Sequence, residues 1–127
     1  MRCNFLFLAA CCAFLGVGFG AFGAHGLKSI LTPDMLAAYK TGVMYQMWHA
    51  LGLAIIAILL HHSAQPKLLI WAGWTMFSGI ILFSGSLYLM AIFSMKWLGM
   101  MTPLGGLAFL TAWLLLCVYA YQNQNVH

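Results

Sequence analysis

The residues of this chain that could do chemistry are few, and most of them lie inside apolar segments. His25 and His49 fall near the ends of two such segments. Two imidazoles at a similar depth could ligate a haem iron axially. A lone histidine near a helix end is more often a hydrogen-bonded structural group, so we expect no cofactor and rank a haem carrier last.

The other reactive residues form no catalytic or metal-binding motif. The only carboxylate is Asp34, so the sequence has no paired acids, and it carries no nucleophile elbow and no phosphate loop. His61 and His62 could suggest copper, but the nine methionines are dispersed and the pair is more typical of a polar helix end. The four cysteines lie in apolar segments without metal spacing. We therefore expect neither a metal site nor an enzyme.

The composition indicates that the chain is a membrane protein. Of the 127 residues, 65% are apolar and 5% are charged, against about a quarter charged in a soluble domain. The five Lys and Arg residues are scattered, whereas a nucleic-acid interface needs them clustered. These numbers exclude a soluble globule, a disordered chain and a nucleic-acid binder. The expected partner is the lipid bilayer.

Four apolar stretches are long enough to cross that bilayer. A hydrocarbon core about 30 Å thick needs roughly 20 mostly apolar residues per helix. The stretches are residues 4–24, 42–60, 68–93 and 103–121. Together they predict an all-α fold, an integral membrane four-helix bundle with short loops, in which residues 1–127 form a single domain.

The expected helix ends follow from glycine, proline and capping residues. Gly26 suits the left-handed residue that often ends a helix. Thr32, Pro33 and Asp34 are typical of an N-cap, a first helical position and an acidic first turn. Thr102 before Pro103 repeats the first two of these signals.

The first apolar stretch also resembles a targeting signal. Arg2 precedes an apolar run, and Leu8 to Cys11 resembles a lipoprotein cleavage box. Only a few apolar residues precede Cys11, against the 7–15 of a signal peptide. We expect this stretch to remain as the first helix.

Small residues recur at helical spacing along each stretch. In lipid, helices associate through close backbone approach and hydrogen bonds, which small residues permit. The glycines expected to pack are Gly16, Gly20, Gly79, Gly85, Gly105 and Gly106. The contacts could lie within the bundle or between subunits, which leaves a homo-oligomer or a larger membrane complex open.

Polar residues of all four stretches gather toward one side of the membrane. With the second helix starting near residue 42, His49 would lie only about 10 Å below its start. The cluster comprises His25, Tyr45, Gln46, His49, Ser84, Ser86, Tyr88 and Thr102. Polar groups in lipid are costly unless paired, so the cluster is either a set of helix-packing hydrogen bonds or a ligand site. We also expect Tyr39, Tyr45, Tyr88 and Trp97 in an aromatic belt on this side.

Four parts of the sequence form a recognisable set: Gly20–Leu27, Thr41–Gln46 with His49–Leu51, Leu82–Tyr88, and Thr102–Phe109 with Trp113. In this order they resemble the domain-of-unknown-function 423 family of bacterial membranes, which has an animal relative called transmembrane protein 256. The resemblance covers about residues 5–117. It departs at Ala112, where the family commonly has glycine. It implies a multi-pass plasma-membrane protein with no assigned activity and supplies no catalytic residues.

Two main hypotheses for the function remain. The first is a non-enzymatic accessory or scaffolding protein that acts through helix–helix contacts. The second is a component that binds or transports a small molecule, lipid or ion. This second hypothesis predicts a cavity on the side of the membrane where the polar residues gather, lined by Tyr45, Gln46, His49 and Ser86.

Overall fold

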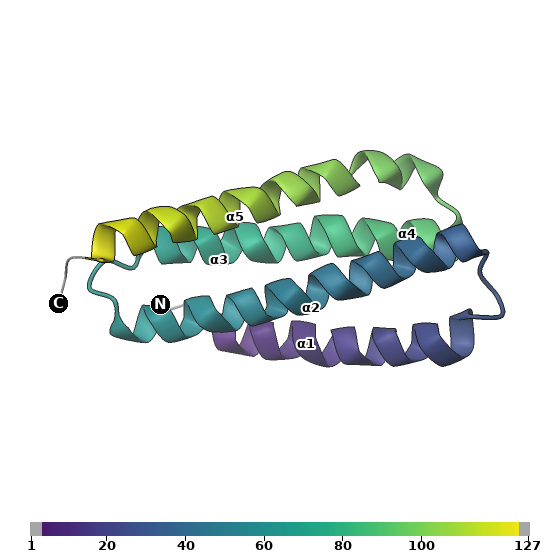
Figure 1. Ribbon diagram of the computed structural model, residues 1–127, viewed down its shortest axis with the longest axis horizontal. Helices are drawn as coiled ribbons and strands as arrows, with labels where there is room; N and C mark the ends of the chain where they lie inside the picture. The colour runs from purple at the N-terminus through teal and green to yellow at the C-terminus, as the bar shows by residue number, and fades with distance from the viewer. Residues whose placement is uncertain (1–3, 125–127) are drawn as a thin grey trace.

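The computed structural model describes residues 4–124, and helices account for nearly all of them (Figure 1). The α-helices are α1 (Phe5–Phe22), α2 (Pro33–His62), α3 (Lys67–Gly79), α4 (Gly85–Phe93) and α5 (Thr102–Asn123). Three shorter turns are η1 (Gly23–Leu27) and η2 (Ile80–Ser84), which are π-helical, and η3 (Lys96–Met100), which is a 3₁₀ helix.

These elements form four long helical segments, because η1 extends α1, η2 joins α3 to α4, and η3 leads into α5. Each segment is long and apolar enough to cross a membrane, with bounds Phe5–Leu27, Pro33–His62, Lys67–Phe93 and Lys96–Asn123. The predicted all-α membrane bundle is confirmed. Lipid offers the backbone no hydrogen-bond partner, so each span satisfies its own N–H and C=O groups as a helix.

The four segments run antiparallel to their neighbours in sequence (Figure 1). The α1–α2 and α4–α5 connections lie at one end of the bundle, and the α2–α3 connection lies at the other. The most extensive contacts join α1 with α2 and α3 with α5. The topology therefore brings the expected polar segments of all four spans toward the same end.

The second helix begins at Pro33, as the capping residues predicted, although the apolar span was predicted to begin only near residue 42. Thr32 is its N-cap, and the Thr32 hydroxyl accepts a hydrogen bond from the Met35 amide at 3.3 Å. Pro33 occupies the first turn as predicted. The helix then continues without a break through residue 42, where the sequence predicted the span to begin. This extension moves every later residue of α2 deeper into the bundle than expected.

The prediction that Gly26 ends the first helix in a left-handed conformation was wrong. Gly26 lies within the right-handed π-turn η1, and no described glycine has a positive φ. The left-handed residue is Ser94, with φ 55°, which ends α4. A π-turn widens the helix by one residue per turn and has no simple sequence signal.

The buried core is apolar at the end of the bundle near the α2–α3 connection. Phe5, Leu53, Ile56, Leu69 and Met76 are almost completely buried there. A smaller cluster of Leu27, Tyr39 and Ala91 closes the opposite end.

Four of the six glycines predicted to pack do so. An added methyl group would meet the Met47 side chain at Gly16, the Val43 side chain at Gly20, the Phe109 ring at Gly79 and the Phe83 backbone at Gly105. The prediction was wrong for Gly85 and Gly106, which have open space at the Cβ position. Gly105 and Gly106 are adjacent and so point about 100° apart around α5, which lets only one of them face α4 and η2.

Four further glycines pack against a neighbouring helix. An added methyl group would meet the Tyr39 ring at Gly23, the Tyr88 ring at Gly42, the Met76 side chain at Gly52 and the Phe5 ring at Gly73. Each of them accommodates one large side chain of a neighbouring helix.

Candidate functional site

Most residues of the predicted polar cluster take part in hydrogen bonds between helices. Gln46 is buried at the centre of α2. Its Nε2 donates to the carbonyl of Cys12 in α1 at 2.7 Å, and its Oε1 accepts from the hydroxyl of Tyr88 in α4 at 2.6 Å. One amide side chain therefore joins three helices.

Two further bonds connect α2 with its neighbours closer to the end of the bundle. The Tyr39 hydroxyl donates to the carbonyl of Phe19 in α1 at 2.5 Å. The Ser84 hydroxyl donates to the carbonyl of Gly42 at 2.7 Å, from the last residue of the π-turn η2. Both acceptors are helix carbonyls that use a second lone pair. The cross-links consequently cost the helices none of their backbone bonds.

Ser86 and Thr102 form the contact between α4 and α5. Their hydroxyl oxygens lie 2.7 Å apart, and either group can be the donor. The expectation that Thr102 caps α5 was wrong, since the N-cap position belongs to Met101 and no side chain caps that helix. The hydroxyl that could have capped the helix is used between helices instead.

His49 is held at both ring nitrogens. Nε2 lies 3.0 Å from Nε1 of Trp113 in α5, and Nδ1 lies 2.7 Å from the carbonyl of Tyr45. An indole N–H can only donate, so Nε2 accepts, and Nδ1 carries the ring proton and donates a hydrogen bond to the Tyr45 carbonyl oxygen. The His49 ring also stacks on Phe109, with ring centroids 3.5 Å apart. This arrangement defines one neutral tautomer in one orientation.

Sequence reasoning missed Tyr39 and Trp113 as members of this network. Tyr39 was assigned to an aromatic belt together with Tyr45 and Tyr88, yet Tyr39 is buried and the other two are half-buried inside the bundle. The available signal was that a tyrosine or tryptophan inside the membrane needs a partner for its polar hydrogen. The belt prediction fits Trp97, whose side chain is 61% exposed near the end of the bundle.

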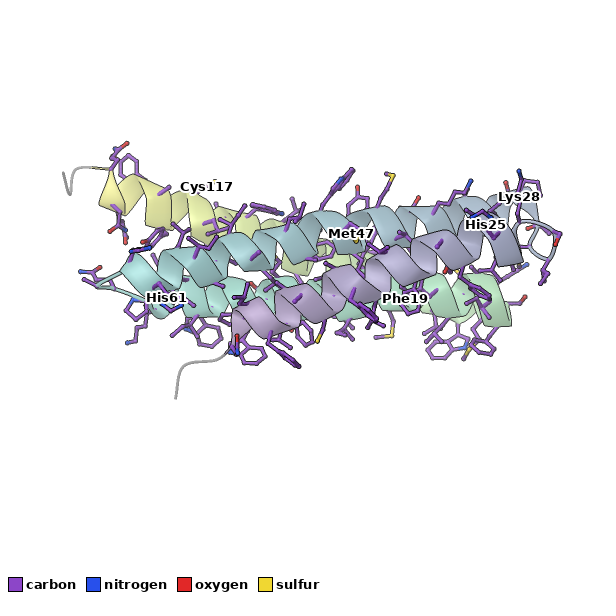
Figure 2. The ribbon with its side chains drawn as sticks, turned by 90° about the horizontal axis from the view of Figure 1, so that it is seen from below. Phe19, His25, Lys28, Met47, His61 and Cys117 are labelled. Atoms are coloured by element: carbon purple, nitrogen blue, oxygen red, sulfur yellow. The ribbon has the colours of Figure 1, made fainter. Side chains whose placement is uncertain are left out.

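His25 lies apart from the cluster, and its inclusion was wrong. Its side chain is exposed at the end of the bundle, near Lys28 (Figure 2). His49 lies 16 residues after the start of α2, or about 24 Å along the helix axis, because α2 starts at Pro33. The two imidazoles are therefore too far apart along the bundle to share one haem iron.

The described residues contain neither a buried side-chain polar atom without a hydrogen-bond partner nor a group of three His, Cys, Asp or Glu that could hold a metal. What the network can do chemically is to hold helices in register. Side-chain bonds between helices in lipid contribute about 0.6 kcal/mol each on average and about 1.7 kcal/mol at most.

A groove opens beside this network, on the surface formed by α2 and α5. It has a volume of about 680 Å³, and Tyr45, His49, Phe83, Phe109 and Trp113 give it an aromatic wall. Gly106 also lines it, and the open space at its Cβ position is part of the groove.

This groove overlaps only partly with the cavity that the sequence predicted. Of the four residues expected to line a cavity, Tyr45 and His49 do so. Gln46 lines a separate hollow of about 340 Å³, together with residues of α1 and α4. Ser86 lines neither, since its hydroxyl bonds to Thr102.

Four apolar spans, short connections and a polar network inside the bundle define a small multi-pass membrane protein. Residues 19–106 match the model of the family described as "Protein of unknown function (DUF423)", and the chain belongs to this family.

Full-length relatives support that assignment. The chain is 47% identical to the UPF0382 membrane protein YwdK of Bacillus subtilis over 116 aligned residues. The aligned residues cover 91% of this chain and 94% of that protein. It is 42% identical over 119 aligned residues to a UPF0382 membrane protein of Staphylococcus haemolyticus. These residues cover 93% of this chain and 95% of that protein. No solved structure matches the chain.

Proposed function

We propose that this protein is a non-enzymatic accessory protein of the bacterial plasma membrane that acts through helix–helix contacts with a second copy or another membrane protein. The hydrogen bonds inside the bundle support a non-enzymatic role. Gln46, Ser84, Ser86, Tyr88 and Thr102 bond to one another or to helix carbonyls, so their polar atoms are already engaged.

The observation that carries the proposal is the outer face of α1. This face has a shallow hollow of about 540 Å³, lined by Ala10, Ala13, Phe14, Val17 and Gly18. A methyl group added to Gly18 would meet nothing within 4 Å. Small residues that leave the backbone accessible are what a transmembrane helix needs to approach another one closely. The α1 and α5 segments are also the least buried of the four spans.

Filling the hollow tests this function. Gly18→Leu should leave the bundle intact, because its Cβ position is open, and should block close approach of another helix. We expect the particle extracted in mild detergent to become smaller on native gels, and chemical cross-links made in the membrane to disappear.

Gly85→Leu is the matched control, because Gly85 also has open space at its Cβ position but does not line this hollow. The Gly85→Leu particle should keep the wild-type size. A wild-type particle that is monomeric and forms no cross-links in its own membrane would contradict the proposal.

The groove between α2 and α5 favours a second candidate, the binding of an uncharged lipid-phase molecule. Its volume of about 680 Å³ lies in the usual range for small-molecule sites, and its lining is aromatic and aliphatic without a charged residue. Gly106→Leu would fill this groove while leaving the α1 face open. Loss of a co-purifying small molecule in Gly106→Leu but not in Gly18→Leu would favour this candidate. The same extractable molecules in both variants and the wild type would argue against it.

A further inference from the structure

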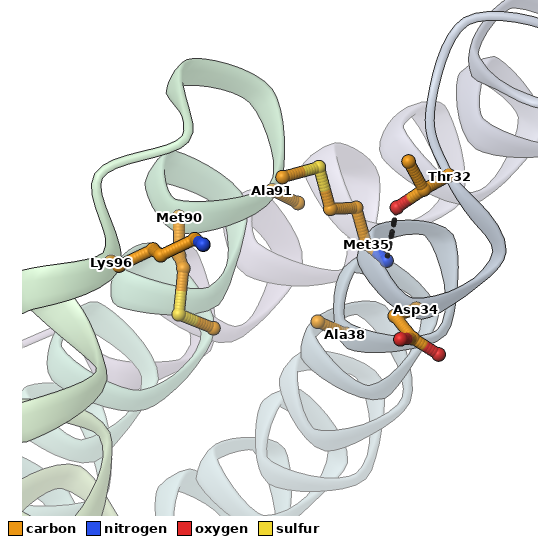
Figure 3. A pocket seen from close by; sticks show the side chains of 7 residues that line it. All are labelled: Thr32, Asp34, Met35, Ala38, Met90, Ala91 and Lys96. Atoms are coloured by element: carbon orange, nitrogen blue, oxygen red, sulfur yellow. Dashed lines mark hydrogen bonds between the residues drawn. The ribbon is translucent and has the colours of Figure 1, made fainter.

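A different pocket lies at the end of the bundle that holds the α1–α2 and α4–α5 connections. It has a volume of about 350 Å³ and lies between the start of α2, the end of α4 and the start of η3 (Figure 3). Met35, Met90 and Ala91 are apolar residues of its lining, and Asp34 and Lys96 are its two charged residues. None of these residues belongs to the polar network or to the hollow on α1.

The two charges come from different elements and are opposite in sign. Asp34 is the only acidic residue of the chain and lies in the first turn of α2, whereas Lys96 begins η3. Figure 3 shows the two side chains apart, and its one dashed line joins Thr32 to the Met35 amide. The pocket therefore presents one negative and one positive group that do not neutralise each other directly.

The pocket lies at the level where spans begin. Pro33 and Lys96 are the first residues of the second and fourth spans, which have 30 and 28 residues. Helices of this length exceed a hydrocarbon core of about 30 Å, so we place Asp34 and Lys96 at the level of the headgroups. Lys28 lies at the same end (Figure 2), and Lys40 lies about two turns into α2, so this end carries three lysines against one aspartate. This positive excess attracts the phosphate layer of a bilayer.

We propose that this pocket binds the headgroup of a phospholipid that carries both a phosphate and a primary amine, as in phosphatidylethanolamine. Lys96 bonds the phosphate, and Asp34 accepts hydrogen bonds from the ammonium group. The side chains of Met35 and Met90 contact the apolar part of the lipid next to its headgroup. Charge complementarity selects this lipid: a trimethylated amine cannot donate to Asp34, and an anionic headgroup without an amine leaves the carboxylate beside a phosphate.

Competition between lipids tests the proposal. The purified protein is placed in mixed micelles with equal amounts of phosphatidylethanolamine, phosphatidylcholine and phosphatidylglycerol, and the retained lipids are counted by native mass spectrometry. We expect the ethanolamine lipid to be retained about tenfold more than the others, as a charge-assisted hydrogen bond implies. Equal retention of the three lipids would overturn the proposal.

Variants assign the preference to the pocket. Asp34→Asn should remove the preference for ethanolamine over glycerol headgroups, and Lys96→Gln should weaken retention of every phospholipid at this site. Lys28→Gln is the control, since it removes a lysine from the same end but not from the pocket. An equal loss of preference in Lys28→Gln would overturn the assignment. Circular dichroism verifies that each variant keeps its helices.

A soluble headgroup separates a lipid site from a simple phosphate site. Free phosphoethanolamine lacks the apolar chain that the Met35 and Met90 side chains would contact. At equal concentration it should fail to displace the lipid. Displacement by the soluble compound would overturn the lipid assignment.

Discussion

In the half of the bundle that ends at the α1–α2 and α4–α5 connections, six side-chain hydrogen bonds join different helices. They extend from Tyr39 near the end to His49 near the middle of α2, and we call this region the polar half. In the opposite, apolar half, the side-chain bonds of Asn4, Ser63, Thr75, Thr111 and Asn123 stay within one helix or one connection. Leu53, Ile56 and Met76 are buried there instead.

The difference shows two ways to specify one bundle in lipid. Lipid tails are as apolar as the core, so packing in the apolar half depends on the fit of large side chains against small ones. Met76 against Gly52 and Phe5 against Gly73 are such fits. Hydrogen bonds in the polar half are few and individually weak. Each one joins a specific donor to a specific acceptor on another helix, so it fixes which helix faces meet. The polar half fixes which helix faces meet through hydrogen bonds, and the apolar half does so through the fit of large side chains against small residues.

The largest effect should come from a contact that cannot relax. A methyl group at Gly105 would collide with backbone atoms of Phe83, whereas its neighbour Gly106 has open space. Gly105→Ala should therefore reduce the free energy of unfolding in mixed micelles by about 3 kcal/mol, at the upper end for an overpacked core. Gly106→Ala should change it little. Equal losses of stability at the two positions would contradict the close contact between Gly105 of α5 and the backbone of Phe83 in η2.

A somewhat smaller effect is expected from a cavity in the apolar half. Leu53 is completely buried, and Leu53→Ala should cost about 2–3 kcal/mol, because its neighbours refill the space only partly. Leu51, 59% exposed on the same helix, is the control and should cost little. The same unfolding measurement checks both. A Leu53→Ala protein as stable as Leu51→Ala would contradict the assignment of this half to packing.

The smallest effect should come from a single bond of the polar half. Gln46→Leu and Tyr88→Phe remove the two partners of the bond at 2.6 Å. The double-mutant cycle should give a coupling free energy of about 1 kcal/mol, within the range for bonds between membrane helices. Additive effects of the two substitutions would show that the side chains do not bond.

The sequence predicted the span count and most of the polar cluster, because both depend on composition and depth. Gln46, Ser86 and Thr102 were recognised as one group on these grounds. Which residue bonds to which could not be predicted, since pairing depends on how each helix is rotated about its axis. Gly106, Tyr39 and Trp113 were misjudged for that reason. His25 and His49 were expected at a similar level because the second span was predicted to begin at residue 42, whereas α2 begins at Pro33 and His49 therefore lies deeper.

The central claim is that the polar half is structural and that its side chains are engaged with one another. His49 tests it most directly, because its ring is the group that a cofactor or a proton-transfer reaction would use. Nitrogen-15 NMR of the protein in lipid bilayers at pH 7 should show one neutral His49 ring with its proton on Nδ1. Trp113→Phe should shift the Nε2 resonance, because that atom loses its donor. A charged ring, a proton on Nε2, or an Nε2 resonance unaffected by Trp113→Phe would contradict the account.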